Sequence, residues 1–213
     1  MIRAVAVAAM VAAATPAHAE PSNQRLVLTG LALAPPTYLI GVSLHEGSHA
    51  LAAVLAGAEV DALHVFPPGR DPSTNTFRFG WTHVRGLRTS GDKVAFYLAP
   101  KITDAALLGG FAALVFTGAW PTNRYGELAL TVFATGLWVD FSKDVVLFAA
   151  TNDVVKALRL WDLTGWRQLP ARLVYAATAV GLGWIVARGY EKLFERPGPM
   201  TEMTALPVVH VAF

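Results

Sequence analysis

The stretch of sequence that decides the fold is TYLIGVSLHEGSHALAAVLAGAEV, residues 37–60. It is apolar over most of its length, yet it contains His45, Glu46 and His49 in an HExxH arrangement. In a helix, residues four positions apart project from one face, so both imidazoles can bind one zinc ion. Ionisable groups inside a membrane helix are costly to bury and mark functional sites. The stretch therefore predicts a membrane helix that carries a metal site.

Glu46 gives this metal site a chemical purpose. It lies beside His45, close enough to reach a water on the metal. Zinc lowers the pKa of such a water, and a carboxylate can take its proton, so hydrolysis of an amide is the expected reaction. A structural zinc site usually has four protein ligands and has no use for a general base. Glu46 therefore favours an enzyme.

The composition places the chain in a membrane. Of its 213 residues, 54% are hydrophobic and 15% are charged, whereas soluble domains carry about one quarter charged residues. The net charge of +2 is scattered, so a nucleic-acid partner is not expected, and without cysteines any metal site needs nitrogen and oxygen ligands. We expect an all-α membrane protein with about four transmembrane helices. The four apolar stretches are Leu26 to Ala58, Val94 to Ala119, Leu128 to Ala150 and Leu173 to Ala187.

Other signals set the boundaries within the chain. An apolar run and Ala17-His18-Ala19 predict a signal peptide over residues 1–19, cleaved before Glu20. One domain is expected over 20–196, followed by a tail over 197–213. Turn formers and alternating apolar residues predict a small β-hairpin inserted at about 60–92. Pro35-Pro36 predicts that the motif helix begins near Thr37.

Residues 45–60 also resemble the signature helix of the site-2 protease family of intramembrane zinc metalloproteases. In that family, HExxH is followed by a small residue, a glycine and an aliphatic residue, which here are Ala53, Gly57 and Val60. Ala53 allows a neighbouring helix to approach, and Gly57 can end the helix in a left-handed cap. The resemblance covers roughly residues 37 to 160.

The second motif of that family is altered in this chain. It usually consists of Gly-Pro followed shortly by an asparagine that faces the active site. Here Ala99 stands for the glycine and Asp104 for the asparagine. The resemblance implies that Asp104 contacts substrate, and the simpler alternative is an ion pair with Lys101.

A catalytic zinc commonly has three protein ligands, so a third ligand is needed. The resemblance implies an aspartate near the third helix, and Thr151-Asn152-Asp153 is similar to that motif without its usual glycine. Asp153 is thus the first candidate ligand, and Asn152 is a polar helper that contacts substrate. Asp140 and Asp144 remain rivals, although each can instead pair with Lys143 or Lys156 at a helix end.

The expected function is that of a Zn²⁺-dependent endopeptidase in which Glu46 activates the water. Its partners would be a membrane protein or peptide substrate and the lipid bilayer, and the export signal suggests a bacterial inner membrane. The hairpin offers an edge to an extended substrate strand. The alternative is a zinc-binding membrane protein without turnover that acts as a binding or regulatory partner. A transporter ranks last, because no internal repeat is evident.

Overall fold

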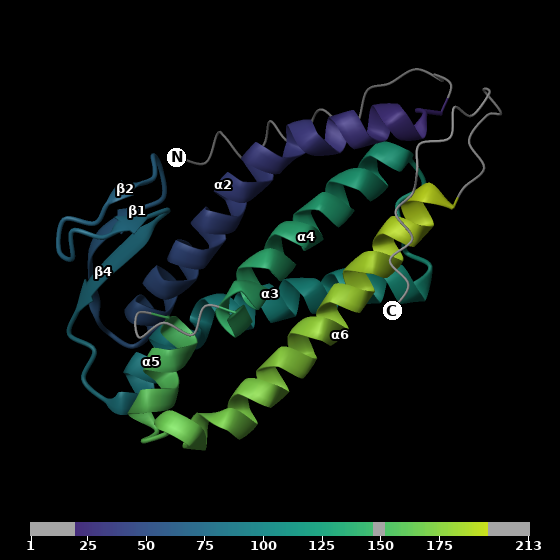
Figure 1. The fold of residues 1–213 in the computed structure, drawn as a ribbon. Coiled ribbons are helices and arrows are strands. Elements are labelled where there is room, and N and C mark those ends of the chain that lie inside the picture. Colours follow the sequence, from purple (N-terminus) through teal and green to yellow (C-terminus); the bar gives the residue numbers. More distant parts are fainter. Residues whose placement is uncertain (1–19, 147–151, 196–213) are drawn as a thin grey trace.

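The computed structural model describes residues 20–146 and 152–195 (Figure 1). The predicted signal peptide over 1–19 and the predicted tail over 197–213 lie outside these residues. The described part is largely helical, with two small antiparallel strand pairs. Its helices are α2 (Asn23–Leu55), α3 (Ser90–Thr117), α4 (Arg124–Val146), α5 (Asp153–Leu160), a 3₁₀ turn (Gly165–Gln168) and α6 (Leu169–Phe194).

The helices form a bundle in which α4 contacts α2, α3 and α6 (Figure 1). Its apolar core joins Leu108 and Phe111 of α3, Leu137 of α4 and Val186 of α6. The fold is mostly helical with a small hairpin after the motif helix, as predicted.

Three of the described helical segments are long and apolar enough to cross a membrane: α2, α3 and residues 165–194. The helix α4 is not among them. It is 23 residues long and carries five charged residues, namely Arg124, Glu127, Asp140, Lys143 and Asp144. A fourth transmembrane span therefore stays a prediction.

The predicted start of the motif helix near Thr37 is wrong. The helix α2 runs without a break from Asn23 to Leu55 and contains Pro35 and Pro36. Prolines are tolerated in membrane helices where neighbouring helices support the chain. Here α4 packs closely on both sides of the pair, because Gly30 lies against Leu128 and Gly136 lies against Thr37.

The C-terminal end of α2 has the predicted left-handed cap. Gly57 has φ of 72°. The N–H of Ala58 donates to the Ala53 carbonyl at 2.9 Å, and the N–H of Gly57 donates to the Val54 carbonyl at 3.0 Å. These two bonds form a Schellman motif. Ala53 is fully buried in a cluster with Phe96 of α3, which confirms that its small side chain lets α3 approach.

The predicted hairpin is present and lies against the C-terminal half of α2 (Figure 1). Strand β1 (Glu59–His64) pairs with β4 (Trp81–Arg85), and β2 (Gly69–Arg70) pairs with β3 (Phe77–Arg78), both antiparallel. Helix α3 then begins with a capping box between Thr89 and Asp92. The hairpin therefore leads directly from the motif helix into α3.

The hairpin tip is organised around the buried carboxylate of Asp71. Its Oδ1 accepts hydrogen bonds from the N–H and the hydroxyl of Ser73, both at 2.8 Å. Arg78 and His83 form ion pairs with the same side chain. Burial alone would raise the pKa of Asp71, but these hydrogen bonds and His83 lower it to about 2.

Candidate metal centre

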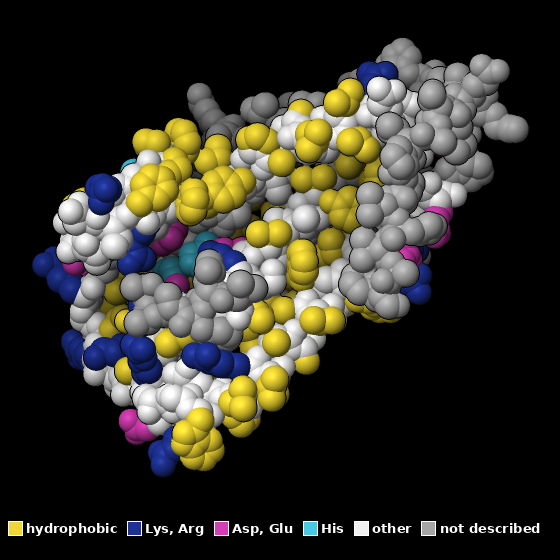
Figure 2. Space-filling model, viewed as in Figure 1, with side chains coloured by type: hydrophobic (Ala, Val, Ile, Leu, Met, Phe, Trp, Pro, Cys, Tyr) yellow, Lys and Arg dark blue, Asp and Glu magenta, His cyan; other side chains and the backbone are white. Residues whose placement is uncertain are grey.

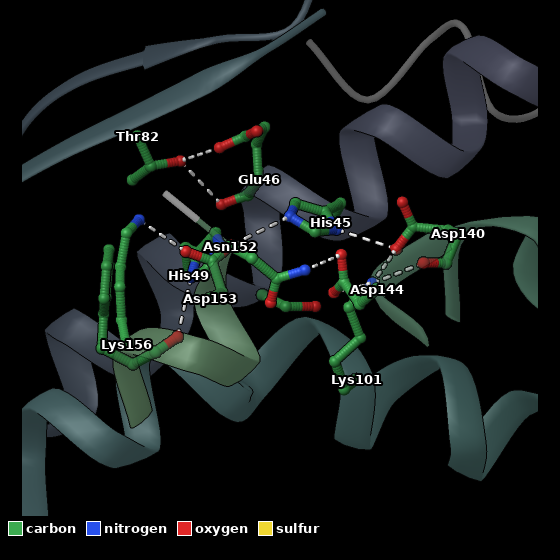
Figure 3. A network of polar contacts seen from close by, with 12 residues as sticks. His45, Glu46, His49, Thr82, Lys101, Asp140, Asp144, Asn152, Asp153 and Lys156 are labelled. Carbon is green, nitrogen blue, oxygen red and sulfur yellow. Dashed lines mark hydrogen bonds and ion pairs between the residues drawn. The ribbon is translucent and has the colours of Figure 1, made fainter. Parts of the chain in front are cut away.

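Helix α2 projects both motif histidines toward the first residue of α5 (Figure 3). The Oδ2 of Asp153 lies 3.3 Å from Nε2 of His49 and 3.7 Å from Nε2 of His45. The ligand atoms of these three residues all lie within 4.8 Å of one another. Within residues 20–146 and 152–195, this is the group of histidine and acidic side chains that is close enough to hold a metal ion.

The second nitrogen of each imidazole is bound to an acceptor. Nδ1 of His49 donates to the Phe96 carbonyl at 2.7 Å, and Nδ1 of His45 donates to Oδ2 of Asp140 at 2.9 Å. A carbonyl or a carboxylate can only accept, so each Nδ1 carries a proton. In both rings the other nitrogen, Nε2, faces Asp153 and is the atom available to a metal ion. Two imidazole nitrogens and one carboxylate, oriented by outer partners in this way, fit a catalytic zinc site with one open position.

Asp153 is held in an ionised form. Its Oδ1 accepts a hydrogen bond from Lys156 at 2.8 Å, which leaves Oδ2 on the histidine side. Burial alone would raise the pKa of Asp153, but its contacts with His45, His49 and Lys156 lower it well below the ordinary value. The carboxylate is therefore ready to accept a cation.

Glu46 lies on the hairpin side of the helix and is only 7% exposed. The hydroxyl of Thr82 on β4 lies 2.8 Å from Oε2 of Glu46 and 3.0 Å from its backbone carbonyl, and can donate to either (Figure 3). Gly80 allows this approach, since a Cβ there would lie 2.8 Å from Cγ of Glu46. The hairpin thus fixes the carboxylate expected to act as the base.

The two rival aspartates lie on helix α4. Asp140 contacts Nδ1 of His45 and the exposed Lys143. The ion pair with Lys143 is one of the alternatives expected for it. Asp144 does not pair with Lys156: its Oδ2 lies 3.2 Å from Nζ of Lys101. Neither side chain belongs to the three-residue cluster.

The two residues predicted to contact substrate are buried beside these aspartates. Asp104 lies 3.7 Å from Nζ of Lys101, which is the alternative pairing considered for it. Asn152 caps α5 by accepting from the N–H of Val155, and it donates to Oδ1 of Asp144 at 2.8 Å. Neither lines the cavity at the site, and their contact with substrate stays a prediction.

The two histidines of the hairpin, His64 and His83, have local partners. His64 donates to the Pro67 carbonyl at 2.7 Å and stacks on Trp81, while His83 pairs with Asp71. Neither belongs to the three-residue cluster.

A cavity of about 1240 Å³ opens beside the cluster. His45, Glu46, His49 and Asp153 line its polar end, and Figure 2 shows acidic and histidine side chains in a recess below the apolar side chains of the hairpin. Apolar residues of α2, α4 and the hairpin form its walls: Leu26, Val27, Leu31, Val42, Phe77, Phe79, Trp81, Leu128, Val132 and Val139. The cavity can therefore bring an apolar chain segment to the cluster.

Three contributors to this site were missed from the sequence. Thr82 and Gly80 gave no signal, because their role depends on how the hairpin folds back onto α2. Lys101 was considered only as a partner of Asp104. A lysine inside the apolar stretch from Val94 was a usable signal, since buried membrane charges are functional by default.

A family model described as peptidase M50B-like matches residues 4–206 of the chain. No curated protein and no solved structure matches it.

Proposed function

The chain belongs to the peptidase M50B-like family, a site-2 protease family. On this basis we propose that it is a zinc-dependent membrane endopeptidase. The family relation supports a protease that acts within membranes on membrane-embedded proteins. We further propose that it hydrolyses peptide bonds of such proteins, and that the membrane is a bacterial inner membrane. The ligands in this proposal are His45, His49 and Asp153.

One observation carries the proposal: Nε2 of His45, Nε2 of His49 and Oδ2 of Asp153 converge in a cavity that is also lined by Glu46, which is not part of their cluster. Zinc at this site would polarise the scissile carbonyl and make water a better nucleophile at neutral pH. Glu46 accepts the proton of the attacking water and returns it to the nitrogen of the leaving amine. Thr82 keeps the Glu46 carboxylate in place during both transfers.

The cavity supports an apolar substrate. Its walls on α2 and α4 suit a membrane segment, whose amides must leave their helical hydrogen bonds before attack. Trp81, Thr82 and Val84 of β4 line the same cavity. An extended substrate strand would pair with this strand edge, as expected from the hairpin pattern.

Cleavage in membranes tests the proposal. Wild-type protein and the Glu46→Gln variant are reconstituted with zinc into vesicles that contain a mixture of membrane proteins, and new peptide termini are identified by mass spectrometry. We expect termini that appear with the wild type and are absent with the variant or with a zinc chelator.

The alternative function predicts a different result. A non-catalytic zinc-binding partner would retain zinc in both proteins and yield no new termini with either. That result would overturn the protease proposal while leaving the metal site intact.

A further inference from the structure

Lys101 is a buried cation in the middle of the bundle. Its side chain is 4% exposed and projects from the apolar helix α3. Nζ lies 2.8 Å from Oδ2 of Asp140, 2.6 Å from the Asp140 carbonyl and 3.2 Å from Oδ2 of Asp144. A buried charge is tolerated in a protein only where partners compensate it. The two aspartates therefore hold the ammonium group of Lys101 in position.

One chain of contacts leads from Lys101 to the first histidine of the motif. The Oδ2 of Asp140 that accepts from Lys101 is also the atom that accepts from Nδ1 of His45, at 2.9 Å. Nδ1 and Nε2 are the two nitrogens of the same imidazole ring. A fixed Oδ2 therefore fixes both the tautomer and the direction of the Nε2 lone pair.

A second chain of contacts leads from Lys101 to the carboxylate of the cluster. Asp144 contacts Lys101 through Oδ2 and accepts from the side chain of Asn152 through Oδ1, at 2.8 Å. Asn152 caps α5, and Asp153 is the first residue of that helix. The position of Asp153 is therefore coupled to Lys101 through the start of α5.

We propose that Lys101 is a positioning residue of the metal centre, which orients His45 through Asp140 and Asp153 through Asp144 and Asn152. The inference rests on the proposed metal site. Lys101 is bound to none of the three candidate ligands and acts only through these partners. It stands directly after Ala99-Pro100, where the second motif departs from its usual form.

Lys143 provides a matched control. It also forms an ion pair with Asp140, through the other carboxylate oxygen, but its side chain is 42% exposed. Water can replace the exposed contact of Lys143 with Asp140 at little cost in free energy. Losing the buried contact of Lys101 leaves a charged carboxylate without its partner, which costs much more. Removing Lys143 should therefore change the geometry at His45 much less.

Metal affinity tests the proposal without any need for a substrate. Purified full-length protein in detergent is titrated with Co²⁺, followed by its visible absorption, and Zn²⁺ is then added in competition. The variants are Lys101→Gln and Lys143→Gln, with circular dichroism as the check on folding. We expect Lys101→Gln to lose about 10- to 100-fold in affinity for both metals, as for other outer partners of metal ligands, and to show an altered Co²⁺ spectrum. Lys143→Gln should stay near the wild-type values.

The outcomes separate this inference from the proposed function. No metal binding by the wild type overturns the metal site itself. Wild-type affinity and spectrum in a folded Lys101→Gln protein overturn only the role of Lys101. If that variant does not fold, Asp140→Asn and Asp144→Asn test the two chains of contacts one at a time, and wild-type affinity in both overturns the inference.

Discussion

The hairpin and the bundle interior hold the HExxH helix from two sides and by different chemistry. On the hairpin side the partners are uncharged: the hydroxyl of Thr82 binds the Glu46 carboxylate, and Gly80 leaves room for it. On the bundle side they are charged: Asp140 binds His45 and is itself bound by Lys101. The base and the metal ligands thus depend on separate parts of the chain, so substitutions should affect turnover and metal binding separately.

The sharpest separation is expected for Glu46→Gln. Glutamine keeps the size of the side chain but cannot take a proton, and general-base catalysis contributes about 10²- to 10⁴-fold to a rate. Cleavage should fall by that amount while the zinc content per chain stays unchanged. Glu59→Gln, on the exposed part of the hairpin, is the control and should cleave normally. Loss of zinc in Glu46→Gln would contradict the separation.

A smaller loss of turnover is expected for Gly80→Ala. The added methyl would lie 2.8 Å from side-chain atoms of both Glu46 and Val42, so the hairpin or the base must move. A shift of about 1 Å in a catalytic group can cost on the order of 100-fold in rate. Cleavage kinetics and zinc content measure the effect, with zinc expected to remain. Gly69→Ala is the matched control, because the nearest atom there is 3.9 Å away.

Thr82→Val should have a milder effect on the same side. The variant keeps the shape of the side chain and removes the hydroxyl that binds Glu46. A hydrogen bond to a charged group is worth about 1.5–3 kcal/mol, so a loss of at least roughly tenfold in kcat/KM is expected. Thr82→Ser restores the hydroxyl and should recover most of the activity. Equal activity in the valine and serine variants would show that the hydroxyl does not position the base.

The smallest effect is expected at the hairpin tip. The ionised form of Asp71 stabilises the tip above its ordinary pKa of 3.8, and this contribution is lost as pH falls through about 2. Ser73→Ala removes the hydroxyl that donates to Asp71 and should raise its pKa toward the ordinary value. Carboxyl NMR of Asp71 measures the shift, and an unchanged pKa would rule out this role for the hydroxyl.

Local pattern was enough to predict one half of the site. His45, Glu46 and His49 lie on one helical stretch, and their spacing fixes their common face. The cap at Gly57 also follows from local chemistry, whereas the approach of α3 at Ala53 was expected from the family motif. The start of the helix was predicted wrongly, because the packing of α4 against both sides of Pro35-Pro36 is not a local property.

The other half of the site depends on contacts between distant segments. Asp153 came from a resemblance, and its place beside His49 joins residues 104 positions apart. The sequence could not show which of Asp140, Asp144 and Asp104 would lie at the metal. Their contacts with Lys101 form only when α3 and α4 pack together. These contacts can be known only from the tertiary structure.

The zinc content of the purified protein shows whether His45, His49 and Asp153 form one zinc site. Zinc per chain is measured by plasma mass spectrometry on detergent-purified wild type, Asp153→Ala and Asp104→Ala, after dialysis against metal-free buffer. We predict one zinc per chain in the wild type and in Asp104→Ala, and none in Asp153→Ala. Wild-type protein without zinc, or Asp153→Ala with one zinc per chain, would show that these three residues do not form a zinc site.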